Sequence, residues 1–141
     1  STDAISYVLM SDGETNEGTT WEAAHFAAKH QLENLIVIID KNGLQGFGNT
    51  EDILGDSASE EKWRVLGFEV LTIDGHNIEQ IINGIDSLIK SKNGKPKVLL
   101  AQTVKGKGVS FMENKMEWHY ITMNESLYQQ AVDEIKKLYY A

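Results

Sequence analysis

The segment YVLMSDGETNEG, residues 7–18, and the segment NLIVIIDKN, residues 34–42, decide the fold of this chain. Each contains a short apolar run rich in Val, Ile and Leu, which is typical of a parallel strand buried on both faces. Each run ends in an acidic residue, Asp12 or Asp40. Residues 20–32, between the two runs, have the apolar spacing of a helix. The sequence therefore predicts a strand, a tight acidic turn, a helix and a second strand.

The remaining sequence continues this alternation of strands and helices. We expect polar loops over residues 43–59 and 105–123. Asn124 is expected to cap a terminal amphipathic helix. Capping and periodicity predict the other elements: helices at 59–66 and 78–90, and strands at 68–73 and 97–104. The pattern predicts an α/β fold with a doubly wound, mostly parallel sheet, and the whole chain, 1–141, is expected to form one domain.

The composition narrows the classes of protein that fit. Asp and Glu number 21 against 13 Lys and Arg, a net charge of −8, which argues against nucleic acid or an anionic membrane as a partner. The chain has no cysteine, so thiol chemistry is excluded. No segment has the length and apolarity of a membrane span, and no signal-peptide pattern is visible. A cytoplasmic location is therefore expected.

Asp12 and Asn42 are the first candidate site residues. Each follows an apolar run, and the carboxyl ends of parallel strands meet at one crevice, so we expect the two side chains to lie close together. Carboxylate and amide oxygens suit Mg²⁺ or Ca²⁺. Gly13 would let backbone approach a phosphate closely, and Gly18 lies near a helix start that favours anions. The pattern indicates a metal-bridged diphosphate site. The alternative is that Asp12 and Asn42 are ordinary turn residues.

Three further polar residues are weaker candidates. His76 follows the strand predicted at 68–73, where it could contact a ligand, although a hydrogen bond to its own turn is the favoured interpretation. Lys105 and Lys107 alternate with glycines after the strand predicted at 97–104. They could face phosphates, but spacing alone favours solvated loop charges.

The residues around Asp12 and Asn42 carry a resemblance to a known family. Asp12-Gly13, followed after 28 residues by Asn42, is similar to the thiamine diphosphate motif, which is GDG followed further on by Asn. Other segments make the chain resemble transketolase, in particular the amino-terminal subunit of split bacterial transketolases: Trp21-Glu22-Ala23, Lys105-Gly106-Lys107-Gly108, Met112-Glu113-Asn114 and Trp118-His119. The resemblance implies the thiamine diphosphate-binding fold, in its diphosphate-binding form.

The chain departs from the family pattern in three ways. Ser11 stands where the motif has its first glycine, and Tyr120 stands where a glycine usually follows the Trp-His pair. The family also has a further segment upstream of the residues that match this chain. The domain is therefore expected to be incomplete at its N-terminus.

The resemblance implies an activity and a cofactor. Transketolases transfer a two-carbon ketol unit between phosphosugars, using thiamine diphosphate and Mg²⁺, for which Ca²⁺ could substitute. The Asp12 and Asn42 side chains and the Leu44 carbonyl would bind the metal. Residues expected to contact the cofactor are Asp12, Gly13, Glu14, Asn42 and His119.

The resemblance also implies catalytic roles and partners. His119 would act at the cofactor diphosphate, and Glu17 would join a network at a subunit interface that leads to the acid activating the aminopyrimidine. That acid belongs to a pyrimidine-binding domain, in split forms a second polypeptide. The upstream segment, which could be a separate chain, would be a further partner.

Three other interpretations stay open. The alpha subunit of 2-oxo acid dehydrogenases ends its motif in a doubled Asn, where this chain has Lys41-Asn42. Deoxyxylulose phosphate synthase shares a lysine-glycine loop like residues 105–108. A degenerate, non-catalytic assembly subunit would keep the fold but bind no cofactor, and the departures at Ser11 and Tyr120 motivate this third interpretation.

Overall fold

The computed structural model describes residues 4–139. Its centre is a four-stranded sheet in which all neighbouring strands are parallel and the order is β1-β2-β6-β5. The strands are β1 (Ser6–Ser11), β2 (Leu35–Lys41), β5 (Glu69–Asp74) and β6 (Lys97–Gln102). The register places Ser11 beside Asp40, so the predicted site residues follow neighbouring strands. The predicted α/β fold with a parallel sheet is confirmed.

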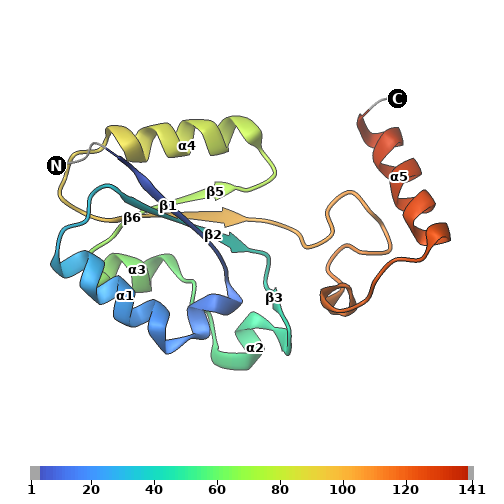
Figure 1. Ribbon diagram of the computed structural model, residues 1–141, viewed down its shortest axis with the longest axis horizontal. Helices are drawn as coiled ribbons and strands as arrows, with labels where there is room; N and C mark the ends of the chain where they lie inside the picture. Colours follow the sequence, from blue (N-terminus) through green and yellow to red (C-terminus); the bar gives the residue numbers. More distant parts are fainter. Residues whose placement is uncertain (1–3, 140–141) are drawn as a thin grey trace.

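Helices cover both faces of the sheet (Figure 1). Helices α1 (Gly18–Lys29) and α3 (Glu60–Leu66) lie on one face, and α4 (Ile78–Lys90) lies on the other. On the first face, the buried Trp63 ring packs against Trp21 and Phe68, with ring centroids 5.2 and 5.0 Å away. On the second, Leu88 and Leu99 lie in a separate apolar cluster. The arrangement is doubly wound, as the alternation predicts.

Local sequence signals set several helix ends. The side chains of Ser59, Asn77 and Asn124 accept hydrogen bonds from backbone amides three residues further on, at 3.4, 3.0 and 2.9 Å. Gly67 ends α3 in the left-handed conformation, with a φ of 102°. Such caps satisfy amide and carbonyl groups that the helix itself leaves unpaired.

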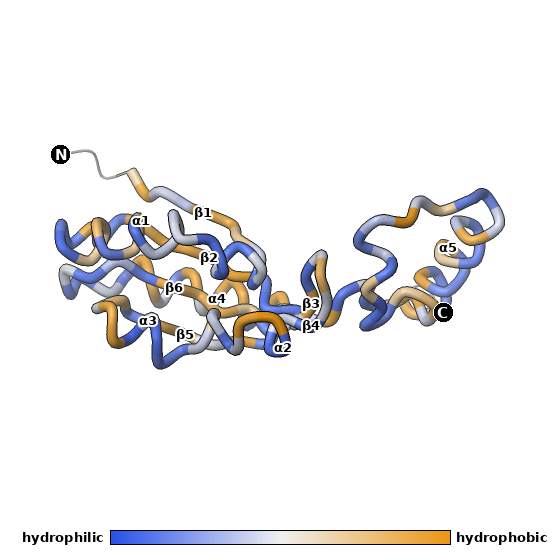
Figure 2. The backbone as a smooth tube through the Cα atoms, turned by 90° about the horizontal axis from the view of Figure 1, so that it is seen from below, coloured by the Kyte–Doolittle hydropathy of each residue, from blue (hydrophilic) through white to orange (hydrophobic). Residues whose placement is uncertain are grey.

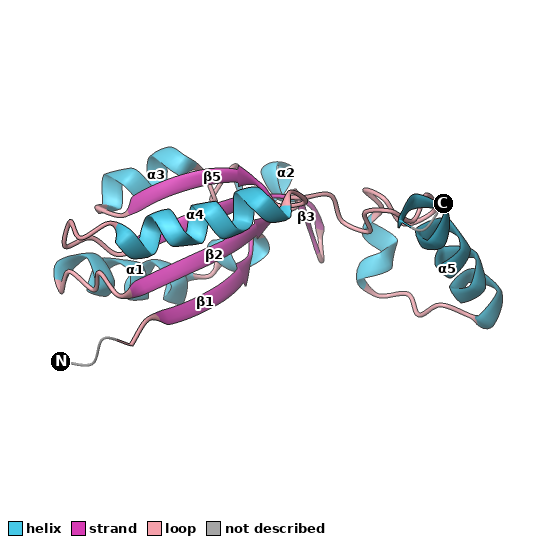
Figure 3. Ribbon diagram, turned by 90° about the horizontal axis from the view of Figure 1, so that it is seen from above, coloured by secondary structure: helices cyan, strands magenta, loops and turns pink. Residues whose placement is uncertain are grey.

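Strand β1 differs from its prediction as a strand buried on both faces. It lies at one edge of the sheet, as Figure 3 shows, and β2 is its one strand neighbour among residues 4–139. Tyr7, Val8 and Leu9 expose 50%, 41% and 74% of their surfaces. Strand β2, between β1 and β6, is well buried, as predicted. The apolar run predicts a strand correctly, but its cover does not come from the described residues.

The predicted loop at 43–59 is more structured than expected. It contains a short antiparallel hairpin of β3 (Leu44–Gln45) and β4 (Gly48–Asn49), followed by α2 (Thr50–Leu54). The Asn49 side chain caps α2 by accepting from the amide of Glu51 at 3.0 Å. Two-residue strands are too short to show a periodicity, which is why the sequence did not predict them.

Other element boundaries also shift. Helix α1 begins two residues before its predicted start at Thr20, and a positive φ of 52° at Gln31 follows its end at Lys29. In α4, isoleucine and leucine residues recur at helical spacing, but Ile78 and Ile82 expose 67% and 56% of their surfaces. The helix contacts the sheet through a narrower stripe than its apolar spacing suggests.

After β6, the chain leaves the layered body as an arm, residues 103–139 (Figure 2). The arm contains η2 (Met116–His119), a short 3₁₀ helix, and ends in α5 (Glu125–Tyr139), which lies apart from the sheet and packs on the arm itself. The Ser110 amide and hydroxyl donate to the Glu134 carboxylate at 2.6 and 2.9 Å. None of the helices within residues 4–139 combines the length and apolarity needed to cross a membrane.

Candidate functional site

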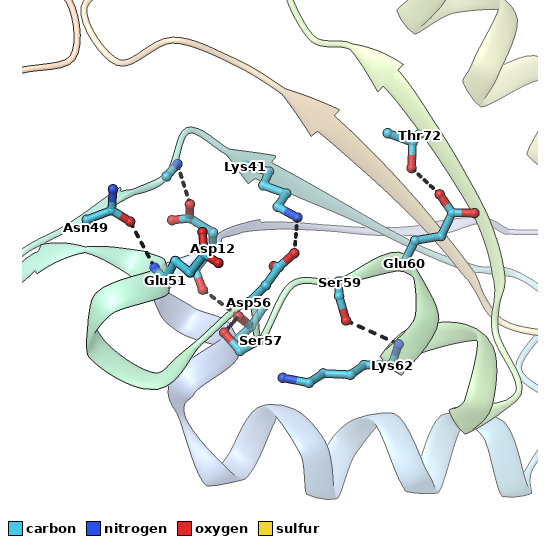
Figure 4. Close-up of polar contacts among 12 residues, drawn as sticks. Asp12, Lys41, Asn49, Glu51, Asp56, Ser57, Ser59, Glu60, Lys62 and Thr72 are labelled. Atoms are coloured by element: carbon cyan, nitrogen blue, oxygen red, sulfur yellow. Dashed lines mark hydrogen bonds and ion pairs between the residues drawn. The ribbon is translucent and has the colours of Figure 1, made fainter.

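Asp12 is the centre of the candidate site. It follows β1 and is almost fully buried, with 1% of its surface exposed. Its Oδ2 accepts a hydrogen bond from the Gly43 amide at 2.6 Å, whereas its Oδ1 has no partner among the described residues (Figure 4). A buried carboxylate oxygen without a partner is costly. A cation held at Oδ1 would remove that cost.

The environment of Asp12 also changes its acidity. Burial raises the pKa of its carboxyl above the usual value, because desolvation disfavours the ionised form. The Gly43 amide, which donates to Oδ2, lowers that pKa in part. The negative charge of Asp40 raises it further. A bound cation would favour the ionised form, so this site is electrostatically suited to one.

A buried hydroxyl pair fixes the backbone of the Asp12 turn. The Thr15 hydroxyl, fully buried, donates to the Asp12 carbonyl oxygen at 2.5 Å and lies 2.5 Å from the Ser57 hydroxyl. The indole N–H of Trp21 donates to the Thr15 carbonyl at 2.9 Å. Residues from η1 (Gly13–Asn16), α1 and the segment before α3 therefore hold this turn together.

Ser11, the first departure from the family motif, takes part in a reciprocal pair. The Ser11 amide donates to the Glu14 carboxylate at 2.7 Å, and the Glu14 amide donates to the Ser11 hydroxyl oxygen at 3.2 Å. This is the pattern of a capping box around η1. The serine is accommodated by the turn, and the Glu14 carboxylate points back to the strand. A contact between Glu14 and the cofactor stays a prediction.

The Asn42–Leu44 segment lies directly against Asp12. The Asn42 side-chain oxygen accepts from the Leu44 amide at 3.0 Å, and Gly43 has a φ of +76°, which favours glycine. The structure thus brings together the two strand ends that the sequence predicts to meet. Among residues 4–139, no three His, Cys, Asp or Glu side chains form a metal cluster. The predicted set of carboxylate, amide and carbonyl oxygens fits Mg²⁺, which needs few protein ligands.

Two amide side chains that the sequence did not predict as site residues line the same turn. A Cβ atom at position 13 would lie 3.0 Å from both Cβ and Oε1 of Gln45, so Gly13 keeps this approach open. The Asn16 side-chain amide donates to Gln45 Oε1 at 3.1 Å. The Gln45 Nε2 and Asn16 Oδ1 atoms are buried without partners among the described residues. The unpredicted hairpin brings Gln45 here, so local sequence carried no signal for it.

Glu17 and His119 lie at the exposed margins. Glu17 precedes α1 and its side chain does not cap the helix. His119 ends η2 on the arm, and its ring packs on Tyr120 with centroids 4.8 Å apart. A Cβ atom at Gly46, in the turn of the β3–β4 hairpin, would lie 3.8 Å from His119 Cε1. The arm therefore returns His119 to the hairpin that begins beside Asn42.

Two of the three weaker candidates, His76 and Lys107, have structural partners. The His76 Nε2 atom accepts from the Val104 amide at 2.8 Å, which favours the interpretation that this histidine supports the backbone. The Lys107 Nζ atom lies 3.7 Å from the Glu113 carboxylate, which favours the interpretation of Lys107 as a solvated loop charge.

The fold and this arrangement define a class of protein, a doubly wound α/β domain with an oxygen-rich site at the carboxyl ends of its strands. Comparison with known proteins specifies the class. Residues 1–139 match the model of the transketolase, thiamine diphosphate binding domain family. The chain belongs to this family.

Curated relatives include single subunits of transketolases. The chain is 43% identical over 130 residues to an apulose-4-phosphate transketolase subunit of Actinobacillus succinogenes, covering 92% of this chain and 46% of that protein. It is 40% identical over 131 residues to 6-deoxy-6-sulfo-D-fructose transketolase subunit SqwG of a Clostridium species, covering 93% and 47%. The chain thus spans about half the length of these relatives. The likeness favours transketolase over the 2-oxo acid dehydrogenase and deoxyxylulose phosphate synthase alternatives.

Solved structures agree on the fold. Transketolase from Campylobacter jejuni superposes with a TM-score of 0.86 at 30% identity, covering 94% of this chain and 20% of that one. A Pichia stipitis transketolase superposes with a TM-score of 0.71 at 22% identity, covering 94% of this chain and 23% of that one. This second likeness supports the fold alone. The thiamine diphosphate-binding fold expected from the sequence is confirmed.

Proposed function

We propose that this chain anchors the diphosphate and metal of thiamine diphosphate in a transketolase, which transfers a two-carbon ketol unit between phosphosugars. The observation that carries the proposal is the buried Asp12 carboxylate, which has one oxygen unpaired and the other bonded to the Gly43 amide directly after Asn42, in a member of the transketolase family. A cation at that oxygen would connect the protein to an anionic cofactor.

The chain's own residues suggest how the cofactor would be held. Asp12 Oδ1, the Asn42 side-chain oxygen and the Leu44 carbonyl would coordinate Mg²⁺, with Ca²⁺ as a possible substitute. Gly13 would leave room for a diphosphate oxygen, and the unpartnered Gln45 N–H could donate to it. When bound, thiamine diphosphate supplies the electron sink that a ketol transfer requires.

His119 and Glu17 would act at the margins of that cofactor. His119 would donate a hydrogen bond on the diphosphate side, within reach of the hairpin that carries Gly46. Glu17, exposed before α1, would meet a pyrimidine-binding domain contributed by a second polypeptide. This proposal divides the active site between this chain and its partner.

The exposed surface of β1 supports the proposal that further protein packs against this edge of the sheet. Tyr7, Val8 and Leu9 are exposed there, and a groove of about 280 Å³ runs between β1 and α1, lined by Val8, Ala23 and Phe68 among others. Exposed apolar surface of this kind marks an interaction site. We propose that a segment equivalent to the upstream part of the family covers this edge, either in the same polypeptide or as a separate chain.

The transferred sugar is not specified by the likeness. The names of the two bacterial relatives refer to apulose 4-phosphate and to 6-deoxy-6-sulfo-D-fructose, which are different substrates. We propose only the class, a ketose donor and a phosphorylated sugar. The cytoplasmic location expected from the sequence likewise stays a prediction.

The test combines binding and turnover. The chain would be purified alone and with its pyrimidine-binding partner and any upstream chain, and each sample titrated with thiamine diphosphate with and without Mg²⁺. We expect Mg²⁺-dependent binding and ketol transfer by the complete assembly, and no turnover by this chain alone. An assembly that binds no cofactor would instead identify a degenerate, non-catalytic subunit. Turnover by the isolated chain would contradict the divided active site.

A further inference from the structure

Tyr120, the second departure from the family pattern, makes a contact across 74 residues of sequence. Its hydroxyl donates to the carbonyl oxygen of Gly46 at 2.7 Å. A Cβ atom at position 46 would collide with that hydroxyl oxygen and lie 3.4 Å from Cζ of the ring. Gly46 does not have a positive φ, so backbone conformation does not demand a glycine there. A glycine fits at position 46 because the Tyr120 phenol occupies the space that a side chain there would take.

This contact joins two segments of the proposed site. Gly46 lies in the β3–β4 turn, and β3 begins at Leu44, the predicted carbonyl ligand of the metal. Tyr120 directly follows His119, the residue predicted to act at the diphosphate. The Tyr120–Gly46 hydrogen bond therefore joins the end of η2, where His119 lies, to the β3–β4 hairpin beside the proposed metal site.

The same two residues lie against the His119 ring. The ring packs on Tyr120 at 4.8 Å with an interplanar angle of 49°, and Cε1 lies 3.8 Å from the Cβ position of Gly46. His119 is exposed, and no hydrogen bond of its ring is present among the described residues. Tyr120 and the hairpin backbone are thus the groups that hold the imidazole.

We propose that Tyr120 is a positioning residue, which holds His119 against the β3–β4 hairpin and so toward the diphosphate side of the cofactor site. The proposal rests on the proposed function. Gly46 is its necessary counterpart, because any larger residue would displace the phenol. The Tyr120 departure, which motivated a degenerate interpretation, then has a role in the site.

The experiment is a double-mutant cycle on the complete assembly. Tyr120→Phe keeps the ring and removes the hydroxyl, and His119→Ala removes the positioned group. We expect Tyr120→Phe to weaken Mg²⁺-dependent thiamine diphosphate binding about fivefold to tenfold, the change expected for one hydrogen bond. In the His119→Ala background, the same change should have almost no further effect, because Tyr120 acts through His119. Tyr128→Phe, an exposed tyrosine on α5, is the matched control and should bind like wild type.

A second readout does not depend on the cofactor. The Cε1–H signal of His119 in a histidine-labelled assembly should shift in Tyr120→Phe and in Gly46→Ala, and stay in place in Tyr128→Phe. Binding by the wild type with no loss in Tyr120→Phe, or an equal loss with and without His119, would overturn this inference alone. An unchanged His119 signal in both Tyr120→Phe and Gly46→Ala would overturn it as well. A wild-type assembly that binds no cofactor would overturn the proposed function first.

Discussion

The Asp12 turn and the His119 turn supply two sides of the proposed site, and they are held in contrasting ways. Asp12 is buried, and the Thr15–Ser57 hydroxyl pair fixes its backbone from within the fold. His119 is exposed on the arm and is held through Tyr120. A buried turn cannot change without cost to the fold, whereas an exposed one can. Substitutions in the first should therefore affect stability and binding, and those in the second should affect binding alone.

The largest expected effect is at the unpaired carboxylate. Asp12→Asn keeps an acceptor for the Gly43 amide but removes the charge that would bind the metal. We expect Mg²⁺-dependent thiamine diphosphate affinity of the assembly to fall by roughly a hundredfold or more, about 2.7 kcal/mol. Calorimetric titration measures this loss. The control is Asp56→Asn, which removes the half-exposed carboxylate paired with Lys41 at 2.7 Å and should leave the affinity nearly unchanged. Equal affinity in Asp12→Asn and wild type would remove Asp12 from the site.

The same variant tests the raised pKa of Asp12. The folded state holds the Asp12 proton more tightly than the unfolded state. In the absence of metal, ionising Asp12 is therefore less favourable in the folded protein than in the unfolded one. The contribution of Asp12 to the free energy of unfolding should decrease as pH rises from the pKa of Asp12 in the unfolded state through its higher pKa in the folded state. Asp12→Asn lacks this contribution, so its stability relative to wild type should increase over that pH window. Denaturant unfolding at several pH values, in EDTA, measures the difference. A relative stability that decreases with pH would contradict the direction of the pKa.

The hydroxyl pair under the Asp12 turn should contribute to stability. Thr15→Val keeps the shape of the buried side chain and leaves the Ser57 hydroxyl unpaired. We expect the free energy of unfolding to decrease by about 1–3 kcal/mol. Thr72→Val is the control, because Thr72 is exposed and bonds Glu60 at the surface, so its loss should cost much less. Equal costs at the two positions would show that the Asp12 turn is not held from within.

The smallest effect is expected at Ser11. Ser11→Gly restores the glycine of the family motif but removes the hydroxyl that accepts from the Glu14 amide. Cofactor affinity and turnover should stay within about tenfold of wild type, or ~1.4 kcal/mol, because the turn keeps its other contacts. A much larger gain in turnover would show that Ser11 damages the site and would favour a degenerate subunit.

The contrast between the two turns also explains what the sequence could predict. Asp12 and Asn42 end neighbouring parallel strands, so their proximity follows from local patterns and from the rule that ligands lie at the carboxyl ends. The Asn16–Gln45 and Tyr120–Gly46 contacts join residues 29 and 74 positions apart through a hairpin too short for a recognisable pattern. The exposure of β1 escaped prediction for a related reason. An apolar run predicts a buried strand, but it does not say which part of the protein buries it.

We propose that Asp12 holds a cation that also contacts the cofactor diphosphate. Electron–nuclear double resonance on the assembly loaded with Mn²⁺ and thiamine diphosphate detects such a contact, because Mn²⁺ accepts the same oxygen ligands as Mg²⁺. We predict ³¹P couplings to the bound Mn²⁺ in the wild type and in Asp56→Asn, and their absence in Asp12→Asn. Bound Mn²⁺ without ³¹P coupling in the wild type, or coupling that persists in Asp12→Asn, would contradict the claim.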